Sequence, residues 1–138
     1  MPSDINITVT PRDGRQCASS GSKWEPIMGY SRAVRAGNVI AVTGTVGVHA
    51  NGTYPATIGE QTRRSLDIIE AAIEAVGGSM KHVIRTRVFV TDVSKWEEVA
   101  RVHGEVFKDI RPATSILEVA RLIDKDAQIE IEADAIVD

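Results

Sequence analysis

Three carboxylates recur at every second position near the end of the chain, at Glu130, Glu132 and Asp134. A β-strand turns alternate side chains to opposite faces, so these carboxylates share one face of a predicted strand and the apolar residues between them share the other. A carboxylate on a sheet face can orient or deprotonate a water molecule for hydrolysis. It can equally pair with a cation or face solvent. The pattern alone leaves these alternatives open.

A second predicted strand, from about residue 82 to residue 91, carries two arginines with the same alternation. Its apolar face is expected to hold residues 84, 86, 88 and 90. Arg85, Arg87 and Phe89 then share the face of the carboxylates. The two guanidinium groups can pair with glutamates on neighbouring strands, which is the commoner arrangement. Alternatively, one of them can bind the carboxylate of a ligand.

The elements that would position these groups form a single α+β domain over residues 1–138. Two amphipathic helices are expected, one after a capping box at Thr57–Glu60 that ends at Gly77-Gly78, and one after a second box at Ser94–Glu97. The face of the second helix is expected to hold Trp96, Val99, Ala100, His103, Val106 and Phe107. Alternating patterns predict strands near residues 5–10, 31–36, 39–46, 82–91, 111–122 and 129–137. Residues 12–26 are expected to form a loop.

Strand–helix–strand units cross over with a right hand, so both helices should cover one face of a mixed sheet. The other face is then uncovered and carries a mixture of polar and apolar side chains, which is often an oligomer interface. We expect this face to hold Thr43, Thr45, Arg85, Arg87, Phe89, Ile116 and Glu118.

Composition excludes several classes of partner. The net charge of −3 and an aromatic content of 4% favour neither nucleic-acid binding nor an anionic membrane surface. The three histidines are not spaced as metal ligands, and no phosphate-binding loop is present, so no metal or cofactor is expected. The single cysteine, Cys17, and the absence of a signal-peptide or membrane-spanning pattern lead us to expect a cytoplasmic protein.

Several segments together resemble the Rid (YjgF-type) proteins, many of which are enamine/imine deaminases. They are Gly29-Tyr30-Ser31, Gly37-Asn38-Val39-Ile40, Thr43-Gly44, Gln61-Thr62-Arg63-Arg64-Ser65-Leu66, Val88-Phe89-Val90-Thr91-Asp92, Pro112-Ala113, Glu118-Val119-Ala120-Arg121-Leu122 and Ile129-Glu130-Ile131-Glu132-Ala133. The resemblance extends from about residue 30 to residue 137. It implies a chorismate-mutase-like fold and a homotrimer with a central barrel and small-molecule sites between subunits.

The resemblance also assigns site residues one by one. Tyr30 matches the pocket tyrosine, Thr43 the pocket serine, and Glu130 the glutamate that positions the attacking water. Thr114 stands where the deaminases carry an arginine that binds the substrate carboxylate, and Ile116 stands where a smaller residue, often cysteine, is found. A threonine has no charge and cannot replace the two parallel hydrogen bonds of a guanidinium.

We therefore expect a Rid-family protein that binds a small polar metabolite between subunits and is not a standard enamine/imine deaminase. The alternative is an enamine or imine hydrolase in which Arg87 or Arg85 replaces the missing arginine. A nuclease or translation-inhibitor role, for which some family members are named, is disfavoured by the acidic charge and the scarcity of aromatic residues.

Overall fold

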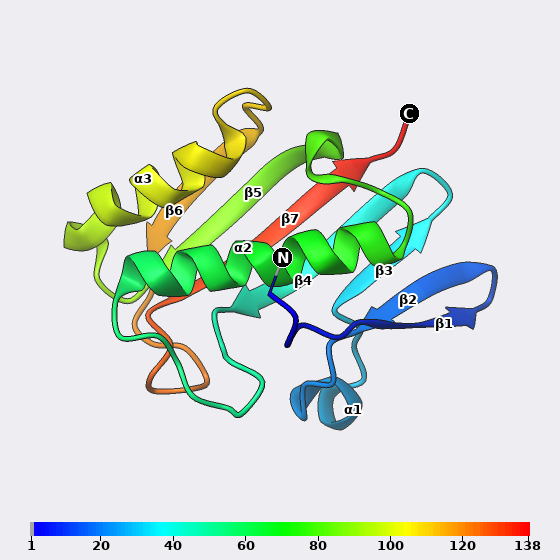
Figure 1. The fold of residues 1–138 in the computed structure, drawn as a ribbon, viewed down its shortest axis with the longest axis horizontal. Coiled ribbons are helices and arrows are strands. Elements are labelled where there is room, and N and C mark those ends of the chain that lie inside the picture. The colour runs from blue at the N-terminus through cyan, green and yellow to red at the C-terminus, as the bar shows by residue number, and fades with distance from the viewer. Residues whose placement is uncertain (1) are drawn as a thin grey trace.

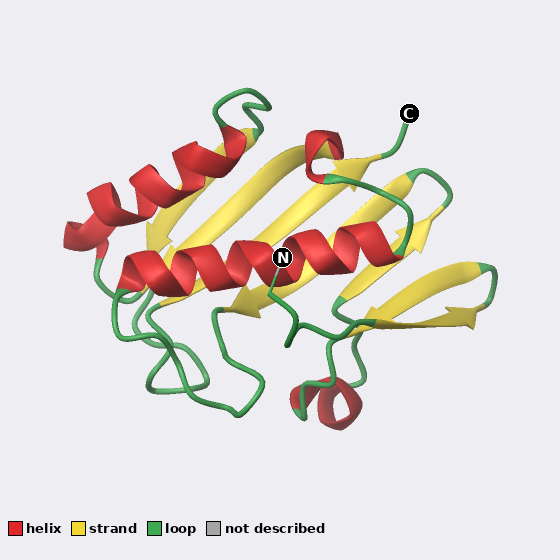
Figure 2. Cartoon of the chain, viewed as in Figure 1, coloured by secondary structure: helices red, strands yellow, loops and turns green. Residues whose placement is uncertain are grey.

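A seven-stranded sheet forms the framework of the computed structural model, which describes residues 2–138 (Figures 1 and 2). Its strands are β1 (Thr8–Arg12), β2 (Arg15–Ser19), β3 (Ala33–Ala36), β4 (Val39–Val46), β5 (Val83–Val90), β6 (Ala113–Glu118) and β7 (Ile129–Ile136). Their order is β1-β2-β3-β4-β7-β5-β6, and every neighbouring pair is antiparallel except β5 and β6. The carboxylate-bearing strand β7 therefore lies inside the sheet, between β4 and β5.

Two helices, α2 (Ile58–Ala75) and α3 (Trp96–Phe107), pack across one face of this sheet, as predicted (Figure 1). A five-residue helix, α1 (Trp24–Met28), lies beyond one end of the strands, and two 3₁₀ turns, η1 (Met80–His82) and η2 (Val93–Lys95), complete the elements. The mixed sheet with its helices on one face confirms the predicted chorismate-mutase-like fold. Among residues 2–138 no helix is both long and apolar enough to cross a membrane.

The core lies between α2 and the central strands. The predicted apolar face of α2 is buried against β4 and β7, with Ile58, Leu66, Ile69 and Ile73 each no more than 2% exposed. The Thr57 hydroxyl accepts a hydrogen bond from the Glu60 backbone N–H (3.1 Å), so the predicted cap is confirmed.

The N-terminal segment differs from the prediction, because residues 12–26 are not simply a loop. They contain β2 and most of α1. Asp13 and Gly14 adopt left-handed backbone angles (φ 50° and 77°) and make a two-residue turn that pairs Arg12 with Arg15. Such Asp-Gly turns join antiparallel strands because their twist matches that of the strands. The Asp-Gly pair was therefore a hairpin signal that the prediction missed.

Two local predictions near β5 are wrong. A register shift between Val83 and Arg85 buries Val83 (3% exposed) and exposes Ile84 (50%), so Ile84 is not on the helix-covered face. Before α3, the Asp92 carboxylate accepts the Ser94 N–H (3.0 Å) and caps η2, so the predicted Ser94 capping box is not formed.

The helix itself begins at Trp96, which is 52% exposed. Ala100 is exposed too. The prediction that Trp96 and Ala100 lie on the packed face of α3 is therefore wrong. Val102, which the prediction left out, is buried beside Val99 and Phe107.

The uncovered face also holds fewer of the expected residues. Arg85, Arg87 and Phe89 lie on it, in register with the three carboxylates of β7. A bulge in β4 between Val42 and Thr45 instead turns Thr45 to the helix-covered side, where it is 2% exposed. Parallel pairing with Val88 and Val90 places Ile116 and Glu118 on the helix side of the edge strand β6.

Candidate ligand-binding site

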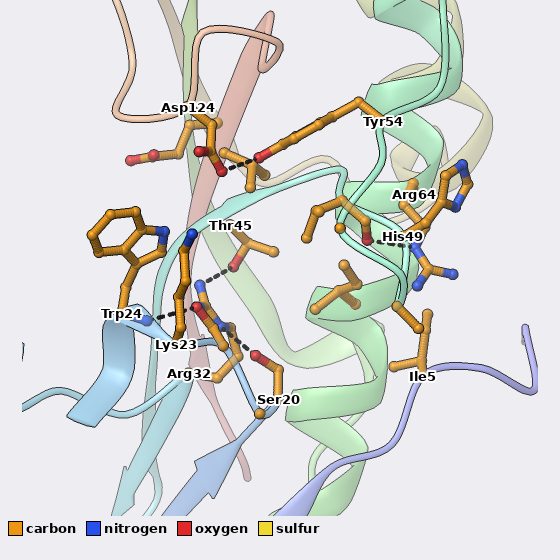
Figure 3. Close-up of a pocket in the computed structure, with 18 of the residues that line it drawn as sticks. Ile5, Ser20, Lys23, Trp24, Arg32, Thr45, His49, Tyr54, Arg64 and Asp124 are labelled. Carbon is orange, nitrogen blue, oxygen red and sulfur yellow. Dashed lines mark hydrogen bonds between the residues drawn. The ribbon is translucent and has the colours of Figure 1, made fainter. Parts of the chain in front are cut away.

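A cleft of about 660 Å³ opens at the end of the sheet where β4 ends and β7 begins. Loops that lie far apart in the sequence surround it (Figure 3). The lining is drawn mainly from four segments, residues 4–6, 20–24, 44–54 and 123–126, together with Tyr30, Arg32 and Glu130. It therefore joins two of the predicted site residues, Tyr30 and Glu130, with an arginine that the prediction did not include.

The Glu130 side chain is the carboxylate of this cleft. It extends from the beginning of β7 on the uncovered face, in register with Phe89 and Val46. It lies directly over Gly44, so that a Cβ atom at Gly44 would overlap Oε2 of Glu130. Within residues 2–138, no group hydrogen-bonds to or forms an ion pair with this carboxylate.

Burial raises the pKa of Glu130, and the positive charge of Arg32 partly offsets this effect. The neighbouring charge of Glu132 adds to the rise. Glu130 is thus a partly desolvated carboxylate that lines the cleft and has no partner among the described residues.

Arg32, which lines the same cleft as Glu130, belongs to a buried ion pair. Arg32 and Glu25 are 6% and 5% exposed, and Nη2 of Arg32 lies 3.4 Å from Oε2 of Glu25. The hydroxyls of Ser19 and Ser20 each donate to the Glu25 carboxylate at 2.7 Å. Burial alone would raise the pKa of Glu25, but these hydrogen bonds and the charge of Arg32 hold that pKa below its usual value.

The remaining N–H groups of Arg32 hold the floor of the cleft together. Nε donates to Ser20 (3.2 Å), and Nη1 donates to the Gly44 carbonyl (2.8 Å) and to the Thr45 hydroxyl (3.4 Å). Figure 3 shows Arg32 between Thr45 and Ser20. All five guanidinium N–H groups are engaged once the bonds to Glu25 and Tyr30 are counted.

Tyr30 completes the arrangement. Its hydroxyl oxygen accepts a hydrogen bond from Nη2 of Arg32 (3.4 Å), and its ring lies 5.5 Å from the guanidinium carbon. Because the oxygen already accepts from Arg32, the hydroxyl hydrogen remains free to donate to a molecule in the cleft.

The sequence analysis did not include Arg32 because it interpreted residues 31–36 as an ordinary strand. The sequence does show a charged residue directly before the strand Ala33–Ala36, and the structure shows that Arg32 and Ala33 are both buried there. A buried arginine requires a partner, and such a partner is a reason to look for a polar site.

The rim of the cleft is closed by a contact between two loops. The Tyr54 hydroxyl donates to the Asp124 carboxylate at 2.6 Å (Figure 3). Burial, followed by the hydrogen bond and the negative charge of Asp124, raises the pKa of Tyr54. At the mouth, the Lys23 ammonium lies 5.0 Å from the centre of the Trp24 ring.

The other predicted site residues do not line the cleft of their own chain. The Thr43 backbone N–H donates to the Arg32 carbonyl (3.0 Å), so Thr43 adjoins the cleft without lining it. The Thr114 hydroxyl lies 2.8 Å from that of Thr86, on the helix side of the sheet. Ile116 points to the same side as Thr114, whereas Glu130 lies on the opposite face.

The arginines of β5 lie further along the uncovered face. Nη1 of Arg87 contacts Glu132 (3.2 Å) and Asp134 (3.1 Å), which is the structural pairing that the sequence left as one alternative. Arg85 is exposed and makes no ion pair within the described part of the chain. Neither arginine nor Phe89 lines the cleft. Nor do residues 2–138 contain a group of three His, Cys, Asp or Glu side chains that could hold a metal ion.

Comparisons with known proteins agree with this fold. The sequence model of the Endoribonuclease L-PSP family matches residues 21–137. The 2-iminobutanoate/2-iminopropanoate deaminase of Escherichia coli is 38% identical over 111 residues, which cover 78% of this chain and 86% of the relative.

Solved structures of similar proteins have the same fold as this chain. A Mycobacterium tuberculosis member of the YjgF/YER057c/UK114 family is 46% identical, with a TM-score of 0.83 over 89% of this chain and 99% of its own. Escherichia coli TdcF, solved with bound serine, is 32% identical, with a TM-score of 0.74 over 79% of this chain and 88% of its own. The chain therefore belongs to the Endoribonuclease L-PSP family, whose members are also known as Rid or YjgF-type proteins.

Proposed function

We propose that this protein binds a small polar metabolite in the cleft of Tyr30 and Glu130 and is not a standard deaminase of imines derived from amino acids. The observation that carries the proposal is the Glu130 carboxylate, which lines a cleft of about 660 Å³ and has no partner within residues 2–138, in the same cleft as a tyrosine hydroxyl that is free to donate. Such convergent polar groups in a cleft are typical of a small-molecule site.

The residue at position 114 argues against the compounds that are named with two of the relatives as ligands of this chain. One relative is named for 2-iminobutanoate and 2-iminopropanoate, and another was solved with serine. Each of these compounds carries a carboxylate. Thr114 has no charge, and its hydroxyl already contacts Thr86 at 2.8 Å. It offers no counterpart to a guanidinium that would bind a carboxylate with two hydrogen bonds.

We further propose that the protein is a homotrimer in which a second copy completes the site. Thr114 and Ile116 lie on the opposite face of the sheet from Glu130, so one chain cannot bring these residues together. Edge strand β6 is exposed along its whole length and carries Ile116 and Leu117, which are 39% and 48% exposed. An exposed edge with apolar side chains is suited to association with another copy.

The second candidate function is hydrolysis of an imine or enamine. Glu130 could orient a water whose oxygen attacks the imine carbon, while Tyr30 donates its hydroxyl hydrogen to the substrate. The C=N bond would be replaced by C=O, and ammonia or an amine would leave. Arg87 is poorly suited to serve as a relocated clamp, since Glu132 and Asp134 already hold it.

The decisive experiment measures hydrolysis of imines generated in situ from several amino acids. We expect the wild-type protein to accelerate their breakdown little. Thr114→Arg should then give weak hydrolysis, and Thr114→Arg with Ile116→Cys should give more, because the clamp and the space for the substrate are both restored. A charge-assisted clamp contributes roughly 1.5–3 kcal/mol, or about ten- to hundredfold in binding.

A wild-type rate similar to that of an arginine-bearing relative would contradict the proposal. In that case, loss of activity in Arg87→Ala would support the relocated-arginine alternative. Activity that survives this substitution would leave Arg87 as a structural residue of the sheet.

A further inference from the structure

We infer that the cleft selects small imines or enamines that are cationic or neutral and that lack a carboxylate beside the reacting carbon. This inference rests on the proposed function, because it names the class of ligand that the Tyr30 and Glu130 cleft would take. It follows from where the cleft carries charge, and from which of those charges already have a partner.

The negative charge of the cleft is available to a ligand. Glu130 is half-buried, lies against Gly44, and has no hydrogen-bond or ion-pair partner within residues 2–138. A protonated imine carries N–H groups that would donate to this carboxylate in a charge-assisted hydrogen bond. A ligand carboxylate at the same place would instead bring two like charges together in a partly desolvated site.

The positive charge beside Glu130 is not available. Arg32 is 6% exposed, and Glu25, at 5%, already balances its charge behind the floor of the cleft. Its N–H groups are all engaged, including the 2.8 Å bond to the Gly44 carbonyl. To clamp a ligand carboxylate with two hydrogen bonds, Arg32 would have to give up at least two of these five bonds and share its charge with the buried Glu25, and weakening a buried ion pair is unfavourable.

The other charged groups of the lining do not alter this balance. Arg64 donates to Asp4 (2.8 Å) and to the Val48 carbonyl (3.0 Å). The remaining charged groups of the lining are two of each sign, Lys23, Lys125, Asp124 and Asp126, and all of these except Asp124 are exposed. Among the charged groups that this chain contributes, Glu130 is therefore the half-buried one that has no partner within residues 2–138.

Two ions of the same planar shape and opposite charge test this inference. Propanamidinium resembles a protonated imine, and propanoate resembles the carboxylate end of an amino-acid-derived imine. Titration of the wild-type protein with each ion, followed by the NMR shift of the Gly44 amide, gives both affinities. We expect propanamidinium to bind at least about tenfold more tightly than propanoate, because its N–H groups would donate to the charged Glu130 carboxylate.

Variants identify the charge that is responsible. Glu130→Gln should remove the preference for propanamidinium. Glu25→Gln would leave the charge of Arg32 unbalanced and should shift the preference toward propanoate by about tenfold or more. Glu105→Gln, at an exposed position on α3, removes one carboxylate without touching the cleft and should leave both affinities unchanged. If Glu25→Gln fails to fold, Glu130→Gln still provides the test.

Equal or tighter binding of propanoate by the wild-type protein would overturn the inference, as would a preference that survives Glu130→Gln. Either result would leave the proposed function standing, because the cleft would still bind a small molecule. If neither ion shifted the Gly44 amide, both the inference and the proposed cleft would be contradicted.

Discussion

At the scale of single residues, the site depends on a glycine that makes room for a carboxylate. Gly44 lies in the β4 bulge, where its carbonyl accepts from Arg32 (2.8 Å) and its Cα faces Oε2 of Glu130. The same residue therefore connects the buried ion pair with the carboxylate that faces the cleft. In the sequence, Thr43-Gly44 is one of the segments that carry the family resemblance. The structure gives a physical reason for the glycine, because a side chain at position 44 would overlap Glu130.

Gly44→Ala should destabilise the protein by about 0.5–1.5 kcal/mol, because the added methyl overlaps the end of the flexible Glu130 side chain and forces it out of its present rotamer. Urea denaturation measures the change. Gly104→Ala provides the matched control, since a Cβ there meets nothing within 4 Å and the position lies inside α3. That variant should be more stable than the wild type by about 0.5–1 kcal/mol. Equal effects of the two substitutions would contradict the close contact.

Glu130→Gln should stabilise the folded protein at neutral pH. Burial raises the pKa of Glu130 in the folded state, so folding favours its protonated form. The stability that this provides is present below the unfolded pKa, about 4.3, and is lost as pH rises through the folded pKa. The glutamine variant does not ionise and avoids this loss. Urea denaturation from pH 4 upward should show the difference growing, and a difference independent of pH would contradict the assignment.

At the scale of elements, the bulge in β5 decides which side chains the helices cover. Strict alternation would bury Ile84, whereas the register shift between Val83 and Arg85 buries Val83 instead. Beyond the bulge the alternation resumes, which brings Arg87 opposite Glu132 and Phe89 opposite Glu130. One extra residue in the strand thus sets the partners of the whole β5–β7 pair.

Val83→Thr should destabilise the protein by about 1–3 kcal/mol, because it places a hydroxyl within the buried hydrophobic cluster. Ile84→Thr, at a 50% exposed position, should change the free energy of unfolding by no more than about 0.5 kcal/mol. Thermal or urea unfolding of the two variants under identical conditions makes the comparison. The reverse order would mean that strict alternation, and not the bulge, describes this strand.

At the scale of the whole molecule, the proposed homotrimer determines whether the site is complete. Within one chain the helices bury the inner face of the central strands, whereas all of edge strand β6 is exposed, including Ile116 on its helix side. We expect light scattering at micromolar concentration to give three times the chain mass of 14.9 kDa. A monomer mass would contradict the trimer and the inter-subunit site together.

Ile116→Asp should dissociate the trimer, because it would place an unpaired carboxylate in the interface. Val9→Asp is its control, since Val9 is exposed to a similar degree, 40%, but lies on β1 at the opposite edge of the sheet. Sedimentation or light scattering should report a smaller species for the first variant and an unchanged one for the second. Dissociation by both variants, or by neither, would argue against β6 as the interface.

The sequence by itself determined the elements whose signals are local. Helix α2 carries its cap at Thr57 and its apolar face at three- and four-residue intervals, and β7 alternates carboxylates with apolar residues. These periodicities follow from the geometry of a single helix or strand, so they can be read without knowing the neighbours. The periodicity left the role of Glu130 open. It was the resemblance that matched both Glu130 and Tyr30 to one site, and in the structure both side chains line the same cleft.

Only the tertiary structure decided how these elements meet. The contact between Gly44 and Glu130 joins residues from two neighbouring strands, and the pair of Arg32 and Glu25 forms where the turn after α1 brings them together. The faces of Thr45 and Ile84 depend on bulges, each of which shifts the alternation by one residue. Register, bulges and buried charge pairs are properties of contacts between elements, and no periodicity within a single element specifies them.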